Sequence, residues 1–187
     1  ADADLDKAVN IVVAGGFALT GQACTATSRV IVERPVIKEF TERFVAAARK
    51  LQVGPGLADG VQMGPAVSKG QRKTDLDYIE IARDEGAQVL AGGGTPEGSQ
   101  YGRGHFVQPT VLTNVRPDMR IAQEEVFGPV VGVLEAGDLE EATSASGTDG
   151  VRLERRLRPR EGYEDGGGLR PTLGIVREQR VYGRPRA

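Results

Sequence analysis

Cysteine and histidine are almost absent from this chain of 187 residues, which contains one of each. A single cysteine excludes a disulfide within the chain, as is typical of proteins of the reducing cytoplasm. One cysteine and one histidine do not supply the ligands of an ordinary zinc site. We therefore expect no metal centre.

Long apolar runs are also missing. The chain has no stretch of about 18 apolar residues, so the sequence predicts no membrane-spanning helix. Its first residues, Ala1–Asp6, are acidic where a secretory signal would be basic. With 39% hydrophobic and 27% charged residues, the composition is typical of a globular domain. We expect a cytoplasmic protein without a membrane partner.

Charge is unevenly distributed along the chain. Residues 1–150 hold 14 Lys or Arg against 21 Asp or Glu, whereas residues 151–187 hold ten Arg, no Lys and five acids. From Thr143 onward helical and strand periodicity disappears, and Arg, Gly and Pro dominate. A nucleic-acid-binding arm is disfavoured because this segment has no Lys and only Tyr163 and Tyr182 as aromatics. We expect residues 143–187 to be a disordered or aberrant tail, with no nucleic-acid partner.

Helical and extended patterns alternate in the first 142 residues. This alternation predicts an α/β fold with a mostly parallel sheet and flanking helices. The expected helices are 7–13 with Asp4 or Asp6 as cap, 36–51, and 68–86; the expected strands are 29–33, 88–91, 106–115 and 130–134.

Cys24 lies in the run FALTGQACTA, residues 17–26, where an apolar stretch ends in a Gly-Gln turn. A thiol beside exposed backbone N–H groups provides a nucleophile and donors for the oxyanion that it creates. From the residues alone, the alternative is an inert core cysteine, because unpaired cysteines are among the most buried residue types.

Four segments, in this order, resemble the aldehyde dehydrogenase superfamily. They are Phe17–Ala26, Gly64–Ser68, His105–Val111 and Gln123–Val130. The sequence around Cys24 is most similar to the dehydrogenases of 2-oxoglutarate semialdehyde (2,5-dioxopentanoate). The resemblance covers residues 1–142 and implies a partial aldehyde dehydrogenase catalytic domain over that range.

The resemblance also implies roles for individual residues. Cys24 corresponds to the nucleophile, which forms a thiohemiacetal and then a thioester with an aldehyde. Glu125 corresponds to the glutamate that holds the nicotinamide ribose, and Phe127 to the aromatic residue near the nicotinamide ring. The implied cofactor is NAD or NADP, and the implied product is a carboxylic acid. Without the resemblance, Glu124 and Glu125 would be interpreted as a solvated acidic pair.

Gln71 and His105 have simpler alternatives. Gln71 resembles a ribose-contacting residue, but Ser68-Lys69-Gly70-Gln71 also fits a capping box with Ser68 as N-cap. His105 begins an apolar strand, where a surface residue is favoured over a general base, and the family pattern assigns it no role.

Members of this superfamily are more than twice as long as this chain. The resemblance places their general-base glutamate and dinucleotide-binding domain before residue 1, so it implies a fragment that is inactive alone. The family would be homo-oligomeric. Two alternatives stay open: a fragment of a CoA-acylating relative, and a non-catalytic remnant that associates with a full-length relative.

The tail has an interpretation of its own. Codons for Val151–Pro159 can be chosen so that a shift of one base encodes Tyr-Gly-Leu-Ser-Ala-Gly-Phe-Val, which resembles the family at about this distance beyond Glu125. We therefore interpret residues 143–187 as the product of a shifted reading frame.

Overall fold

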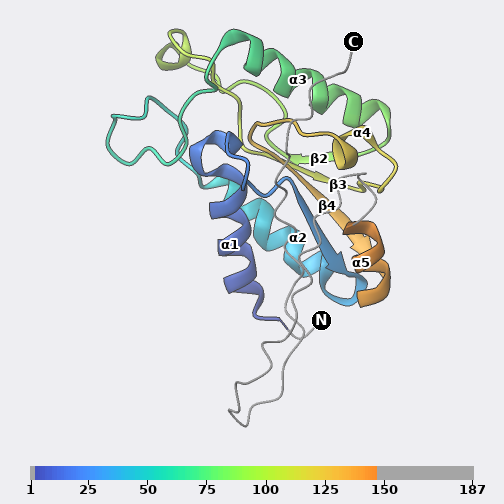
Figure 1. Ribbon diagram of the computed structural model, residues 1–187. Coiled ribbons are helices and arrows are strands. Elements are labelled where there is room, and N and C mark those ends of the chain that lie inside the picture. The colour runs from blue at the N-terminus through green and yellow to red at the C-terminus, as the bar shows by residue number, and fades with distance from the viewer. Residues whose placement is uncertain (1–2, 147–187) are drawn as a thin grey trace, which may run out of the picture.

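The computed structural model describes residues 3–146 (Figure 1). One mixed sheet has the strand order β1-β4-β3-β2. Both β1 and β3 run parallel to the central β4, and β2 runs antiparallel to β3. The expected α/β class with a mostly parallel sheet is confirmed. The strands are β1 (Arg29–Glu33), β2 (Gln88–Ala91), β3 (Thr110–Thr113) and β4 (Val130–Ala136).

Helices cover both faces of the sheet (Figure 1). On one face lie α1 (Leu5–Phe17) and α2 (Arg34–Arg49), and on the other lie α3 (Lys69–Asp84), α4 (Arg120–Gln123) and α5 (Leu139–Ser146). Two 3₁₀ turns, Ala18–Gly21 and Ser99–Tyr101, complete the elements.

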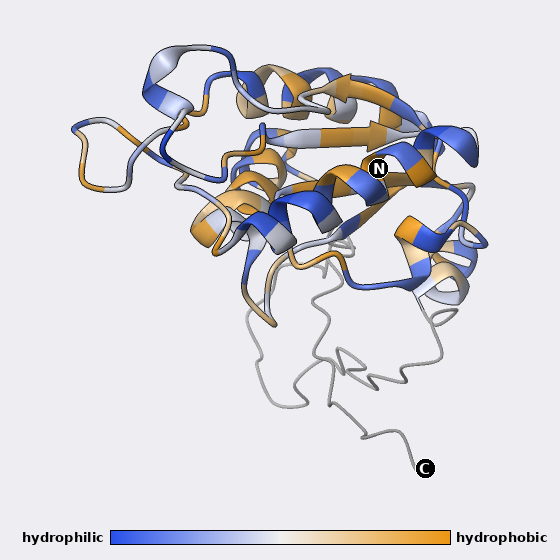
Figure 2. Cartoon of the chain, turned by 90° about the horizontal axis from the view of Figure 1, so that it is seen from above, coloured by the Kyte–Doolittle hydropathy of each residue, from blue (hydrophilic) through white to orange (hydrophobic). Residues whose placement is uncertain are grey.

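Successive side chains of a strand point to opposite faces of the sheet. Because helices cover both faces, the strands are apolar on both sides. In β4, Val131 and Val133 join the core beneath α1 and α2, whereas Val130 and Leu134 join the core beneath α3 and α5. Burying each such side chain contributes roughly 1.5–3 kcal/mol. Figure 2 shows the result: strands that are largely apolar, and helices in which apolar and polar residues alternate.

Two helix starts follow the sequence signals. Asp4 caps α1, its Oδ1 accepting from the backbone N–H of Lys7 at 3.1 Å. Ser68 caps α3, its Oγ accepting from the N–H of Gln71 at 3.1 Å. The helix expected from residue 36 begins two residues earlier, at Arg34, because Pro35 fits the first turn of a helix.

The strand expected over 106–115 is shorter. Only Thr110–Thr113 forms β3. Pro109 has no N–H to offer a sheet, and Asn114 has a φ of +60°, which ends the extended chain. The segment before Pro109 instead packs by its side chains, with Phe106 and Val107 buried.

Two helices, α4 and α5, were not expected. α5 runs to Ser146, four residues past the boundary placed at residue 142, and Asp138 caps it through the N–H of Glu141 at 2.8 Å. Most of the segment interpreted as frame-shifted, residues 147–187, lies outside the described residues. Within the described part, no helix is long and apolar enough to cross a bilayer.

Candidate active site

A strained turn leads from α1 to Cys24. Three consecutive residues adopt left-handed backbone conformations: Leu19 at φ +53°, Thr20 at +60° and Gly21 at +68°. Such a conformation costs roughly 1–2 kcal/mol for a residue with a side chain. The Thr20 hydroxyl stabilises the turn, donating to the carbonyl of Gly64 at 3.1 Å. The turn reverses the chain and delivers Cys24 to the surface.

Cys24 is exposed. The alternative of an inert core cysteine is therefore wrong. The loop that carries it is fixed at both ends: the N–H of Thr27 donates to the carbonyl of Gly15 at 3.0 Å, and Gln22 Oε1 accepts from the N–H of Val67 at 2.8 Å. A thiol on a fixed loop and open to solvent is accessible to a reagent or substrate.

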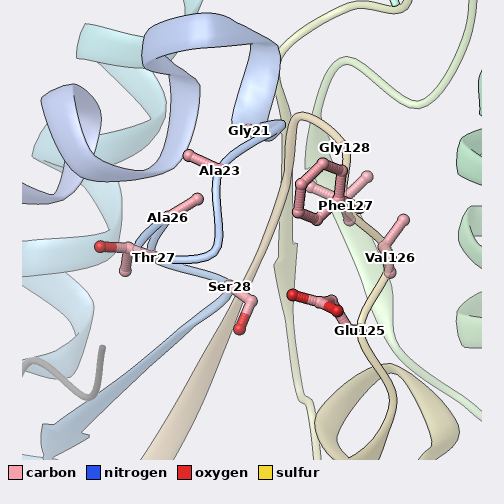
Figure 3. A pocket seen from close by; sticks show the side chains of 10 residues that line it. Gly21, Ala23, Ala26, Thr27, Ser28, Glu125, Val126, Phe127 and Gly128 are labelled. Atoms are coloured by element: carbon pink, nitrogen blue, oxygen red, sulfur yellow. The ribbon is translucent and has the colours of Figure 1, made fainter. Parts of the chain in front are cut away.

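Glu125 and Phe127 lie on the turn between α4 and β4, where Phe127 has a φ of +60°. Together with Gly21, Ala23 and Ser28 of the cysteine loop, they line a pocket of about 20 Å³, room for about one water molecule. Figure 3 shows their side chains facing that loop. The structure thus brings two predicted cofactor residues next to the loop of the predicted nucleophile.

Two glycines make this approach possible. A Cβ on Gly21 would lie 2.1 Å from the carbonyl oxygen of Gly128, and a Cβ on Gly128 would lie 2.1 Å from Oδ1 of Asp75. No side chain fits at either position. The cysteine loop, the Glu125–Gly128 turn and helix α3 are therefore in direct contact.

The four segments that carry the family resemblance form a closed ring of contacts. Residues 17–26 bind residues 64–68 through Gln22 and Thr20. The N–H of Ala66 donates to the carbonyl of His105 at 2.9 Å, and the N–H of Thr110 to the carbonyl of Pro129 at 2.8 Å. The contact of Gly21 with Gly128 closes the ring. His105 contributes through its backbone and does not line the pocket.

Gln71 lies beside this ring, not in the pocket. Its Nε2 donates to the Val126 carbonyl at 2.9 Å and to Asp75 Oδ1 at 2.7 Å. Half of the expected capping box is present, because the N–H of Gln71 donates to Ser68 while its side chain turns toward the Glu125–Gly128 turn. Gln71 therefore ties α3 to the segment that carries Glu125 and Phe127.

Glu124 is held by Tyr78 of helix α3 and by Arg120 of helix α4. Tyr78 of α3 donates its hydroxyl to Glu124, and Arg120 donates to both Glu124 carboxylate oxygens at 2.9 Å. The Arg120 guanidinium also stacks 5.4 Å from the Tyr78 ring centroid. Burial and the neighbouring Glu124 raise the pKa of Tyr78. Helix α3 thus holds the turn from both ends, at Glu124 and at Val126.

Asp75 is the residue that the sequence analysis missed. It is fully buried, and burial raises its pKa from 3.8 to about 6, against the lowering effect of the hydrogen bond from Gln71. The available signal was its position: Gln71, Asp75 and Ile79 recur every four residues and share one face of the helix. No group of three or more His, Cys, Asp or Glu among residues 3–146 could hold a metal ion.

Comparison with known proteins identifies the family. The model of the aldehyde dehydrogenase family matches residues 1–150. The chain belongs to the aldehyde dehydrogenase family. All four predicted site residues, Gln71, Cys24, Glu125 and Phe127, lie within the matched range.

Curated aldehyde dehydrogenases resemble the chain over most of its length. It is 52% identical over 140 residues to alpha-ketoglutarate semialdehyde dehydrogenase of Haloferax volcanii, covering 75% of this chain and 29% of that protein. It is 48% identical over 140 residues to 2,5-dioxopentanoate dehydrogenase of Saccharolobus solfataricus, covering 75% and 28%. The chain thus spans less than a third of the length of these relatives.

Solved aldehyde dehydrogenase structures share the fold. Betaine aldehyde dehydrogenase of Staphylococcus aureus in complex with NAD+ superposes with a TM-score of 0.75 at 37% identity, covering 77% of this chain and 29% of that one. A mutant aldehyde dehydrogenase of Bacillus cereus superposes with a TM-score of 0.72 at 42% identity, covering 77% and 28%.

Proposed function

We propose that Cys24 is the nucleophile of an NAD(P)-dependent oxidation of an aldehyde to a carboxylic acid. The observation that carries this proposal is that the loop of an exposed cysteine and the Glu125–Gly128 turn line one pocket. Family membership supports it, because the matched region includes every residue involved.

The chemistry begins at the sulfur. The Cys24 thiolate adds to the aldehyde carbonyl carbon, giving a thiohemiacetal, and the proposed donor to its oxyanion is the backbone N–H of Cys24. Loss of hydride from the former carbonyl carbon leaves a thioester on Cys24. Water then cleaves the thioester, releasing the acid and restoring the thiol.

The nicotinamide half of the cofactor would contact the Glu125–Gly128 turn, and its chemical contribution is to accept the hydride. The donor set fits: the Glu125 carboxylate accepts hydrogen bonds from a ribose diol, and the ring of Phe127, 37% exposed, offers a flat face. The pocket itself has room for only about one water molecule, so it does not enclose a nicotinamide ring. Gln71 would contribute through the position of the turn.

We propose a semialdehyde as the substrate class, because the named relatives in Haloferax volcanii and Saccharolobus solfataricus act on 2-oxoglutarate semialdehyde, also called 2,5-dioxopentanoate. The lone cysteine suits a reducing compartment, and we place the reaction in the cytoplasm.

We further propose that the 187-residue chain does not turn over aldehydes by itself. Among the residues that the structure describes, none hydrogen-bonds the Cys24 thiol, so none is in position to take its proton directly. Formation of NADH or NADPH by the purified chain, lost on Cys24→Ala, would refute this.

Acylation and cofactor binding test the proposal separately. The chain is treated with p-nitrophenyl acetate, and the acetylated residue is found by mass spectrometry. Acetyl transfer should occur at Cys24 and disappear in Cys24→Ser. In parallel, nicotinamide mononucleotide binding is followed by the NMR signals of the Phe127 ring.

The binding arm has a matched control. Glu125→Ala should weaken mononucleotide binding about tenfold, the effect of losing a charged hydrogen-bonding partner, and leave acetylation of Cys24 intact. Glu140→Ala, which removes an exposed acid on α5, should change neither. Acetylation elsewhere, or mononucleotide binding that Glu125→Ala leaves unchanged, would overturn the assignment.

A further inference from the structure

Asp75 is a buried acid that forms no ion pair with any of residues 3–146. Its side chain is fully buried in α3, and its Oδ1 accepts one hydrogen bond, from Gln71. Its Oδ2 is also buried and has no hydrogen-bond partner among the described residues. A buried polar atom left without a partner is costly, and native proteins rarely retain one without a purpose.

The carboxyl group of Asp75 presses on the Glu125–Gly128 turn. The space that a Cβ of Gly128 would need is taken by Asp75, whose Oδ1, Cγ and Oδ2 would lie 2.1, 2.5 and 2.9 Å from it. The same Gln71 amide that binds Asp75 also donates to the carbonyl of Val126. Asp75 therefore acts on the turn at two points, directly at Gly128 and through Gln71 at Val126.

The contact continues to the cysteine loop. The carbonyl of Gly128 fills the space next to Gly21, three residues before Cys24. Core packing leaves no slack to absorb a shift in such a stack. A shift of the Asp75 side chain therefore moves the backbone of Gly128, which in turn moves the backbone of Gly21 in the loop that carries Cys24.

We propose that Asp75 is a positioning residue, which sets the Glu125–Gly128 turn and, through Gly128 and Gly21, its distance from the Cys24 loop. What the turn and the loop do chemically rests on the function proposed above. The positioning itself rests only on the geometry of Asp75, Gln71 and the two glycines.

The protonation state of Asp75 determines whether its Oδ2 needs a hydrogen-bond donor or an acceptor from its neighbours. A carboxylate requires donors at Oδ2, whereas a carboxylic acid supplies a proton there and requires an acceptor. Because burial raises the pKa of Asp75 to about 6, the exchange between the two forms occurs near pH 6. Titratable or charged groups on the segments packed against Asp75 are Glu124 and Glu125 before the turn, Cys24 beyond Gly21, Arg120 on α4, and Lys69, Arg72, Lys73, Asp77, Tyr78, Glu80, Arg83 and Asp84 on α3 itself.

An NMR titration of the 187-residue chain tests the proposal. The amide signals of Val126, Gly128 and Gly21 should shift together with an inflection near pH 6. Asp75→Asn, which keeps the acceptor for Gln71 but cannot titrate, should abolish the inflection at all three. Asp77→Asn removes an exposed acid that pairs with Lys73 on the same helix and should preserve it.

The reactivity of Cys24 provides a second readout. Relative to Asp75→Asn, the iodoacetamide alkylation rate of the wild-type chain should change by about threefold between about pH 5 and pH 7.5, as expected for coupled sites in contact. Asp75→Leu, which loses the acceptor, should displace the Val126 and Gly128 signals at every pH.

The outcomes separate the two proposals. An inflection that persists in Asp75→Asn, or one absent from the wild type, overturns the positioning role. If the inflection is present and abolished as expected but the mononucleotide does not bind, the positioning role stands and the cofactor assignment fails. None of these measurements requires aldehyde turnover.

Discussion

Gly21 and Gly128 meet backbone to backbone, and the contact joins the loop of Cys24 to the turn of Glu125 and Phe127. A Cβ on Gly21 would lie 2.1 Å from the carbonyl oxygen of Gly128, and Gly21 also has a φ of +68°. Two independent constraints, space and backbone conformation, thus act on the same residue.

Gly21→Ala should destabilise the chain by roughly 2–4 kcal/mol, because it adds left-handed strain to a steric clash. Chemical denaturation measures the loss. Gly56→Ala is the control, since nothing lies within 4 Å of a Cβ there and its φ is not left-handed. If both variants unfold at the same denaturant concentration, the contact of Gly21 with Gly128 is not tight.

Gln71→Leu should cost roughly 1–3 kcal/mol of stability, because it leaves the carbonyl of Val126 and the Oδ1 of Asp75 without their donor. Hydrogen exchange should also accelerate at the Glu125–Gly128 turn. Lys69→Leu, an exposed substitution on the same helix, should do neither. Unchanged exchange at the turn in Gln71→Leu would show that the amide bridge does not hold it.

The raised pKa of Asp75 makes stability depend on pH. The folded chain keeps the proton up to about pH 6, whereas the unfolded chain releases it near pH 3.8. The folded state therefore binds more protons in this window, and the free energy of unfolding falls as pH rises through it. The difference between the two pKa values corresponds to about 3 kcal/mol at most. Thermal unfolding from about pH 4 to pH 7 measures it, and a parallel pH dependence in Asp75→Asn would contradict it.

Cys24 should be alkylated by iodoacetamide in the folded chain. Its side chain is exposed, and as the only cysteine it is the only thiol that can react. Intact-mass analysis should show one adduct, at a rate within about tenfold of that of the denatured chain. A thiol that reacts only after denaturation would mean that the loop is closed over it.

Much of the framework was predictable because its causes are local. The cap of α3 depends on Ser68 and Gln71, three residues apart, and β4 begins with the run Val130–Leu134, which is apolar apart from Gly132. Where one residue overrides the local pattern, the prediction missed: Pro109 and Asn114 shorten β3 on both sides. Helix α4, with four residues, and helix α5 were missed because each has too few apolar residues to produce a clear period.

The candidate site likewise has residues that local sequence motifs identify and one residue that they do not. The order of the four motifs in the chain pointed to Cys24, Glu125 and Phe127, and the structure places Glu125 and Phe127 beside the cysteine loop. Gln71 left two roles open, and its side chain now joins Val126 to Asp75. The burial of Asp75 was beyond local analysis, because a helix face does not reveal what will cover it.

The sequence by itself determined the family, the alternation of helices and strands, and the residue types available for covalent chemistry. Hydrogen bonds and side-chain periods within a few residues were sufficient for the longer helices and most of the strands, and linear motifs were sufficient for the family. Only the tertiary structure decided that Cys24 is exposed, that Gly21 meets Gly128, and that Asp75 is buried with one oxygen lacking a hydrogen-bond partner among the described residues. Those facts depend on close packing between segments far apart in the chain, where the absence of a Cβ matters only once a second backbone occupies its place.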